Sequence, residues 1–193
     1  MLDNTWPGWG LMQTAITGAS GLLGVLVGAL ATMRGQKRSR QLDRIKQQLQ
    51  EFYSPLLAIR NEIRAKSELR VKIHSIASAA YSEELDPPRG MTPEIKEKYD
   101  RLLKYSDVQV RKDLVPQYQA MLKLYLEKRW LAEESTLKFD YELVEFVELW
   151  RRFLDDSLPS RVLMKVDHTE EKLKPFYADL QQCFDMLRQE IEK

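Results

Sequence analysis

The chain has 193 residues, of which 30 are lysine or arginine and 29 are aspartate or glutamate, so its formal net charge is only +1. A near-neutral balance argues against a dedicated nucleic-acid binder, which usually carries a strong positive excess. The single cysteine, Cys183, excludes an internal disulfide and fits a reducing compartment.

The first part of the chain has no charged side chain between Asn4 and Met33. Its apolar part, residues 10–33, is about 24 residues long, and at about 1.5 Å per residue a helix of that length exceeds a hydrocarbon core of about 30 Å. We therefore predict a transmembrane helix at 10–33, after a short extracytoplasmic tail at 1–9. A cleaved signal peptide is the alternative, because Ala29-Leu30-Ala31 resembles a cleavage site. The missing basic residues before the apolar run, and the basic residues after it, favour an uncleaved anchor.

A basic juxtamembrane segment, residues 34–41, follows the predicted span. Lysine and arginine resist translocation, so we expect the N-terminus outside and the C-terminal domain in the cytoplasm. Tryptophans favour the headgroup layer, which gives a predicted membrane interface made of Trp6, Trp9, Arg34, Lys37, Arg38 and Arg40. The basic residues either set the topology alone or also bind anionic headgroups, at about 1 kcal/mol per residue.

Small residues recur every fourth position within the predicted span, at Ser20, Gly24, Gly28 and Thr32. Such spacing lines one face of a helix and lets two backbones approach closely in lipid. The pattern therefore predicts a transmembrane contact face, although similar patterns also occur in spans that do not associate.

Residues 42–193 form the predicted cytoplasmic helical domain. Gly90 is the only glycine after residue 35, good helix formers dominate, and no alternating apolar pattern marks a strand. The sequence thus predicts an all-α fold: one transmembrane helix followed by a helical bundle with a long first helix.

Apolar residues in this first helix are spaced alternately three and four apart, as in a coiled coil. They form a predicted helix–helix seam of Leu42, Ile45, Leu49, Phe52, Leu56, Ile59 and Ile63. Farther along the helix, the basic residues Lys66 and Arg70 occupy the positions at which the seam would continue. A second apolar stripe, offset around the helix from the first, is made of Leu69, Ile73, Ile76 and Ala80. Pro55 predicts a kink or a new helix start, and the helix should end near Tyr81.

Further helices are predicted from capping signals and apolar spacing. Thr92-Pro93-Glu94 should start one that runs to about Lys104, with a restart at Ser106 or Asp107, and Pro116 should open or kink the next. The expected buried residues of the last three helices are Tyr118, Met121, Leu122, Tyr125 and Leu126; then Leu143, Phe146, Val147, Trp150, Phe153 and Leu154; then, from a start near Asp167 or Thr169, Leu173, Tyr177, Leu180, Phe184, Leu187 and Ile191.

An internal echo links the first and last cytoplasmic helices. Residues 49–56 and 173–180 share the pattern Leu-x-x-Phe-Tyr-x-x-Leu. Common aromatic packing explains it better than a duplication, and it predicts that these two helices pack on each other.

Residues that could carry chemistry are few. His74 and His168 lack the Glu-x-x-His spacing of bundle-bound metals, so no metal and no cofactor are expected. Glu142, Glu145 and Glu148 fit a solvated face, with Glu148 reaching Arg152, while Glu62–Lys66 and Glu68–Lys72 fit surface pairs. Cys183 fits a buried thiol without a partner for a nucleophile. An alternative to surface pairing in this part of the first helix is that an acidic partner binds to three arginines, Arg60, Arg64 and Arg70.

The expected function is a membrane-anchored interaction or scaffold protein that acts through protein contacts, in an oligomer or a larger complex, and not an enzyme. The predicted partners are the bilayer and either a second copy or another protein, with no nucleic acid and no small-molecule ligand. A pore-forming effector assembled through the glycine-rich span is one alternative. An enzyme with a site of Tyr, Glu and Arg in the bundle core is another.

Overall fold

A computed structural model describes residues 32–33, 35–84 and 92–192 of the chain. The chain divides into two compact units, Met1–Lys46 and Gln47–Lys193. In the first unit, the described residues 32–33 and 35–46 are helical. The second unit is a helical bundle without a strand in its described residues, which confirms the all-α prediction for that part of the chain.

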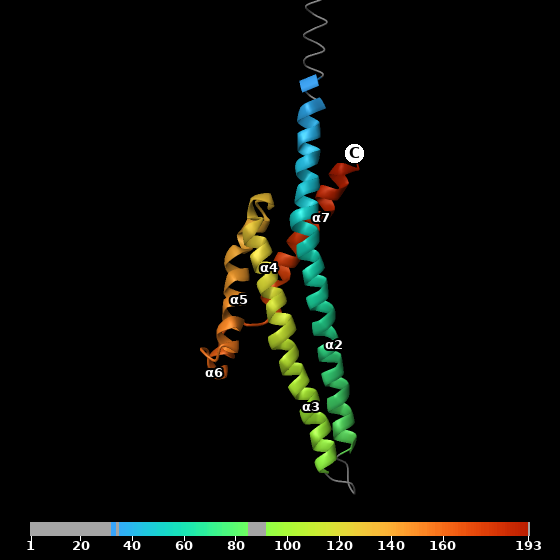
Figure 1. The fold of residues 1–193 in the computed structure, drawn as a ribbon, viewed down its shortest axis with the longest axis vertical. Coiled ribbons are helices and arrows are strands. Elements are labelled where there is room, and N and C mark those ends of the chain that lie inside the picture. Colours follow the sequence, from blue (N-terminus) through green and yellow to red (C-terminus); the bar gives the residue numbers. More distant parts are fainter. Residues whose placement is uncertain (1–31, 34, 85–91, 193) are drawn as a thin grey trace, which may run out of the picture. The chain divides into compact units, whose positions relative to one another are not determined.

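The helices of the bundle follow one another with short connections (Figure 1). A π-helical turn η1, Leu49–Tyr53, leads into the long helix α2, Ser54–Glu84. The remaining elements are α3 (Pro93–Gln109), the π turn η2 (Val110–Leu114), α4 (Val115–Glu127), the short turns η3 (Arg129–Leu131) and η4 (Thr136–Phe139), α5 (Asp140–Leu154), α6 (Ser160–Leu163), η5 (Glu170–Leu173) and α7 (Lys174–Ile191).

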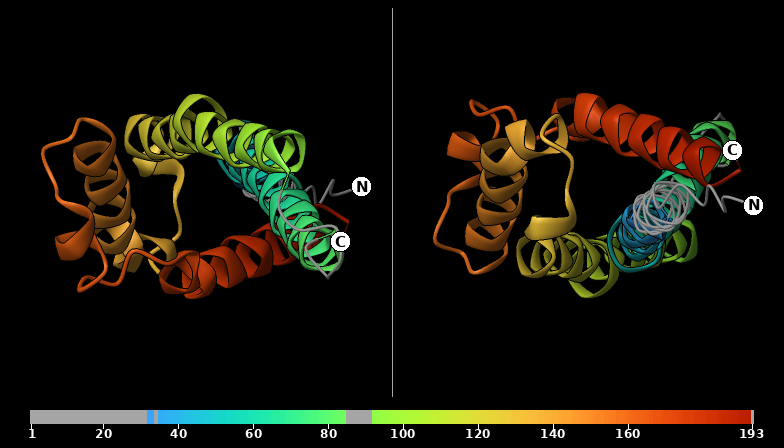
Figure 2. Two further views of the ribbon diagram at one scale, coloured as in Figure 1. Left: turned by 90° about the horizontal axis from the view of Figure 1, so that it is seen from below. Right: turned by 90° about the horizontal axis from the view of Figure 1, so that it is seen from above.

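Within the bundle, α4 lies between the first half of α2 and α5. Helix α7 packs on η1 and α2, and the turn before it, η5, contacts α5, so that α2, α4, α5 and α7 enclose a common core (Figure 2). The second half of α2 lies beside α3.

Aromatic side chains fill the centre of this core. Phe52 and Phe176 both pack against Tyr125, with ring centroids 5.7 and 5.8 Å away, and all three are fully buried. Both copies of the Leu-x-x-Phe-Tyr-x-x-Leu pattern therefore meet in the core, because η1 packs on α7. The predicted contact between the first and last helices is confirmed.

Prolines follow both π turns at the same distance. The residue before each proline donates its backbone N–H five residues back, from Ser54 to the Leu49 carbonyl and from Val115 to the Val110 carbonyl. A proline has no N–H and its ring crowds the preceding turn, so a wider turn accommodates it within a helix. The predicted irregularity at Pro55 is thus a π turn, and the alternative of a new helix start is wrong, because Ser54 has helical backbone angles.

Several predicted details differ from the structure. Helix α3 runs without a restart through Ser106 to Gln109, and α2 continues three residues past Tyr81. Leu126, expected in the core, is half exposed, and Leu122, Trp150, Phe153, Leu154, Phe184 and Ile191 are only partly buried. The short helix α6 was not predicted, since four residues carry too little periodicity to be recognised.

Candidate interaction surface

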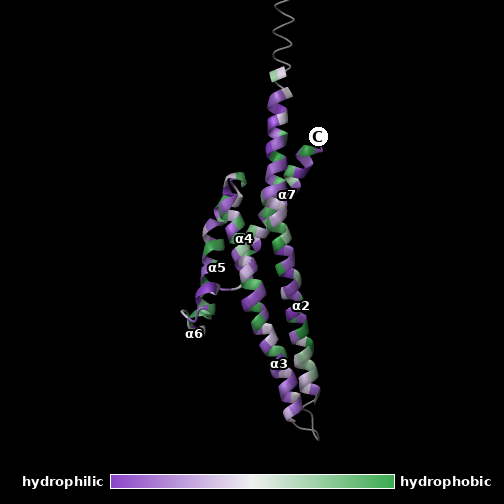
Figure 3. Cartoon of the chain, in the orientation of Figure 1, coloured by the Kyte–Doolittle hydropathy of each residue, from purple (hydrophilic) through white to green (hydrophobic). Residues whose placement is uncertain are grey.

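The second half of α2 and the helix that returns beside it form what we call the arm, residues 64–83 and 92–113. None of the described side chains in the arm is buried, whereas the bundle core includes Leu56, Met121 and Leu180 without exposed surface. Seven large apolar residues of the arm are instead substantially exposed: Leu69, Val71, Ile73, Ile76, Leu103, Tyr105 and Val108. Along both helices of the arm, hydrophobic residues are interspersed with hydrophilic ones (Figure 3).

The two helices of the arm pack loosely on each other, because basic residues occupy positions at which the heptad pattern expects apolar side chains. Arg70 reaches across to Ser106, with Nη1 3.4 Å from Oγ, and its Nε is buried without a hydrogen-bond partner. Lys66 turns back to Glu62 at 2.7 Å. Tyr81 and Tyr99 pack edge to face at 4.4 Å, farther along the arm. Helices draw most of their stability from packing one apolar face, and this arm packs little.

The second stripe is an exposed row of apolar side chains on α2. Leu69, Ile73 and Ile76 have exposed fractions of 56%, 44% and 60%. Their spacing of four and three residues keeps them on one side of the helix, as in a coiled-coil strand. The stripe predicted from the sequence therefore exists, and none of the residues that the structure describes buries it.

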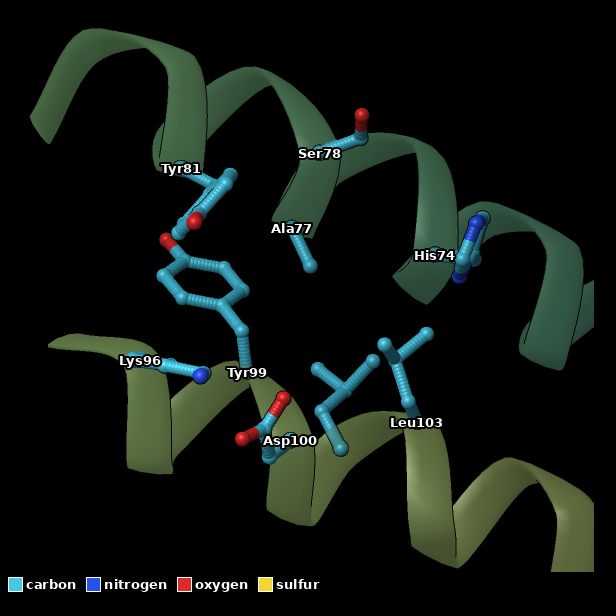
Figure 4. Close-up of a pocket in the computed structure, with 9 residues that line it drawn as sticks. His74, Ala77, Ser78, Tyr81, Lys96, Tyr99, Asp100 and Leu103 are labelled. Carbon is cyan, nitrogen blue, oxygen red and sulfur yellow. The ribbon is translucent and has the colours of Figure 1, made fainter. Parts of the chain in front are cut away.

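A groove of about 230 Å³ runs between α2 and α3. Figure 4 shows Ala77 and Leu103 pointing into the space between the helices, with Tyr81 and Tyr99 closing one end. His74 lies at the other end and Ser78 along the α2 side. The groove is small, and its exposed lining is mostly apolar although Lys96 and Asp100 also line it, so it extends the exposed apolar surface of the arm.

Polar groups also meet inside the bundle, around the loop between α4 and α5. The Glu133 N–H donates to the Tyr53 hydroxyl at 2.9 Å, and Thr136 Oγ1 donates to Asp179 Oδ2 at 2.6 Å. Because the Thr136 proton is used there, the Tyr53 hydroxyl donates to Thr136 Oγ1 at 3.2 Å. Cys183 Sγ lies 3.4 Å from Ser135 Oγ, and its predicted burial is confirmed.

This polar cluster holds the loop in place and offers no obvious catalytic arrangement. Gln48 Nε2 donates to the Leu131 carbonyl at 2.9 Å and to Glu133 Oε1 at 2.8 Å, which fixes the loop to the start of the bundle. Neither histidine takes part: His74 lines the arm groove, and His168 bonds to the Val166 carbonyl at 2.9 Å. The network is mutually satisfied, as buried polar groups in structural roles are. That the chain is not an enzyme stays a prediction.

The three arginines that were predicted as an alternative binding site for an acidic partner do not form one cluster. Arg60 lies over the Tyr177 ring at 5.0 Å, and Arg64 pairs with Glu68 at 2.7 Å. Both line a groove of about 510 Å³ in which Glu170, Glu171 and Lys174 also lie. Arg70 instead faces α3. The groove carries both signs of charge and gives no selective reason to bind an anion.

The predicted seam divides at the unit boundary. Phe52, Leu56 and Ile63 are fully buried, while Leu49 and Ile59 are partly exposed. This part packs inside the chain, on α7 and α4, rather than on another subunit. Leu42 and Ile45 belong to the unit before Gln47, in which Ile45 is buried and Leu42 is partly exposed.

The predicted membrane segment lies mostly outside the described residues. Trp6, Trp9, Arg34, Ser20, Gly24 and Gly28 are not described, whereas Thr32, Lys37, Arg38 and Arg40 are helical and exposed. Over the residues that the structure describes, no helix has both the length and the apolar character to cross a membrane. The anchor at 10–33, its contact face and the pore alternative therefore stay predictions.

The predicted pairing of charged residues is wrong for two groups of glutamates and right for two ion pairs. Glu148 does pair with Arg152 at 2.8 Å, and Glu62 with Lys66. However, Glu145 binds Lys172 of η5 and Glu142 Oε2 is buried, so these glutamates do not form a purely solvated face. Glu68 pairs with Arg64 rather than with Lys72. Among the described residues, no group of three or more His, Cys, Asp or Glu side chains could hold a metal ion.

Comparison of the chain with known proteins gives no relative. No protein-family model matches the sequence, and neither a curated protein nor a solved structure matches the chain. Function must therefore be argued from the arm and the bundle themselves. The weak packing of the arm was not predicted from the sequence. The signal for it was the presence of Lys66 and Arg70 at positions where the heptad pattern expects apolar residues.

Proposed function

We propose that this chain is a membrane-anchored helical interaction protein that acts in the cytoplasm by binding a helix of another protein along its arm. The uncharged segment from Asn4 to Met33 and the basic residues after it support the anchor and its orientation. The exposed stripe of the arm supports the binding role.

The observation that carries the proposal is the contrast between bundle and arm. The bundle has a core of completely buried apolar side chains, which include Leu56, Met121 and Leu180, whereas no described side chain of the arm is buried. In the arm, Leu69, Ile73 and Ile76 are about half exposed on one side of α2. Covering the rest of these three side chains would contribute roughly 2–4 kcal/mol, taking about half of the usual value for each. A partner helix with its own heptad-spaced apolar face would supply that cover.

A double variant of the full-length chain tests the proposal. Membranes are extracted in mild detergent, and the native mass of the complex is measured for the unmodified chain and for Leu69→Asp with Ile76→Asp. Unpaired charges in an apolar contact are costly, so the partner should be lost and the mass should fall to that of the chain alone. Ser75→Asp is the matched control, because Ser75 is exposed and lies about 100° around the helix from Ile76.

Two results would count against the proposal. An unchanged mass for the double variant would show that the stripe is not the binding surface. A chain that leaves the membrane on carbonate treatment would remove the anchor.

A further inference from the structure

Trp130 is exposed on a loop that the bundle holds rigidly. Its exposed fraction is 61%, although the next residue, Leu131, is completely buried. Gln48 binds the Leu131 carbonyl and Lys128 Nζ lies 2.7 Å from Glu51 Oε2, so the residues on both sides of Trp130 are fixed. A large aromatic side chain displayed from a fixed loop is suited to contact another surface.

A second aromatic residue lies at the same end of the bundle. Arg129 and Asp140 form an ion pair of 2.5 Å, which ties the turn that carries Trp130 to the start of α5, where Tyr141 follows Asp140. Tyr141 is also strongly exposed. The basic residues here are already paired with acids, Arg129 with Asp140 and Lys128 with Glu51. A contact at this end would therefore rest on the aromatic rings rather than on net charge.

The loop is tied to the residues at which the chain enters the bundle. Gln48 and Glu51 are among the first residues of the second unit and both bind the loop. Residues 34–47 separate Gln48 from the predicted span, and as a helix these fourteen residues would cover about 21 Å. The end of the bundle that carries Trp130 is thus the end tied most closely along the chain to the predicted anchor.

We infer that Trp130, together with the exposed Tyr141 at the start of α5, inserts into the headgroup layer of the bilayer and gives the bundle a second membrane contact. Indole and phenol rings have an apolar body and a polar tip, which suits them to this layer. The contact requires the basic segment 34–41 to lie along the bilayer surface, which its attraction to anionic headgroups favours. The inference rests on the proposed anchor.

The test uses the full chain in vesicles of phosphatidylcholine with an anionic lipid fraction, with and without bromine on the acyl chains near the headgroups. Three variants keep one tryptophan each, at position 9, 130 or 150, with the other three replaced by phenylalanine. Bromine quenches only nearby indoles. Trp150 is the matched control, because its Nε1 donates to the His168 carbonyl at 3.2 Å and it lies about 14 Å along α5 from Tyr141.

The expected result is a loss of emission for Trp9 and Trp130 and none for Trp150. Quenching of Trp9 alone would overturn the second contact while leaving the anchor, and would make the Trp130 end available to a protein partner. Quenching of Trp130 and Trp150 together would show unspecific insertion and also overturn it. An unquenched Trp9 would contradict the anchor itself.

An independent label guards against misfolded tryptophan variants. Trp130→Cys in a Cys183→Ala background is labelled with an environment-sensitive dye in the full chain. Its emission should shift to shorter wavelength when vesicles are added, and a label at Ser157, an exposed residue beyond the end of α5, should not respond. A response of both labels, or of neither, would contradict the inference.

Discussion

Four tyrosines dominate the polar chemistry of the bundle core. Burial raises the pKa of Tyr53, Tyr118, Tyr125 and Tyr177 above the usual range, and the nearby carboxylates of Glu170 and Asp140 add to the effect for the last three. The core therefore depends on keeping these hydroxyl groups protonated.

This dependence predicts a loss of stability in alkali. The unfolded chain ionises its tyrosines at about pH 10. The folded chain holds these four protonated beyond that pH, so the unfolded state binds fewer protons and the free energy of unfolding falls as pH rises above about 10. Tyrosinate absorbance measures ionisation and circular dichroism measures helix content. Together they should show that these four buried tyrosines ionise only as the helices melt. Complete ionisation of an intact helical bundle would contradict this.

Thr136 is the central member of the polar cluster. It donates to Asp179 and accepts from Tyr53, and it is fully buried. Thr136→Val keeps the shape but removes both of these hydrogen bonds and leaves the buried Tyr53 O–H without its acceptor, which should cost about 1–3 kcal/mol. Chemical denaturation should detect this, while Ser135→Ala, which loses only a 3.4 Å contact to the Cys183 thiol, should cost less. Equal effects would show that the cluster is not organised around Thr136.

At the scale of elements, α2 uses its two halves differently. Its first half buries Leu56 and Ile63 among α4 and α7, and its second half exposes the stripe. Heptad spacing predicted both apolar faces but not which would be covered, because coverage depends on elements far away in the chain. The π turns were also beyond prediction, since a proline within an apolar pattern is equally consistent with a kink or a helix start.

A pair of substitutions in α2 separates its two halves. Leu56→Ala empties a fully buried site and should lower the free energy of unfolding by about 2–5 kcal/mol. Ile76→Ala changes a residue that is 60% exposed and should stay within about 0.5 kcal/mol. Denaturation of the detergent-purified chain compares them. A similar cost at both sites would mean that the stripe is already buried in an oligomer.

At the scale of the whole molecule, composition and periodicity predicted the helical bundle, and the repeated Leu-x-x-Phe-Tyr-x-x-Leu pattern predicted the contact between its first and last helices. The candidate surface was predicted only in part: the stripe was seen in the sequence, but its exposure follows from Arg70 and Lys66 occupying the slots that face α3. Trp130 was not singled out, because one tryptophan beside a buried leucine has no sequence signal for exposure. The anchor at 10–33 stays a prediction from the absence of charge.

The central claim is that the stripe of α2 is covered by another protein while the chain is in its membrane. A photo-crosslinking amino acid at position 76, compared with one at position 75, measures this most directly in intact cells. The predicted result is a discrete crosslinked band at position 76, dependent on an intact Leu69, and little or none at position 75. Equal crosslinking at both positions, or none at position 76, would contradict the account.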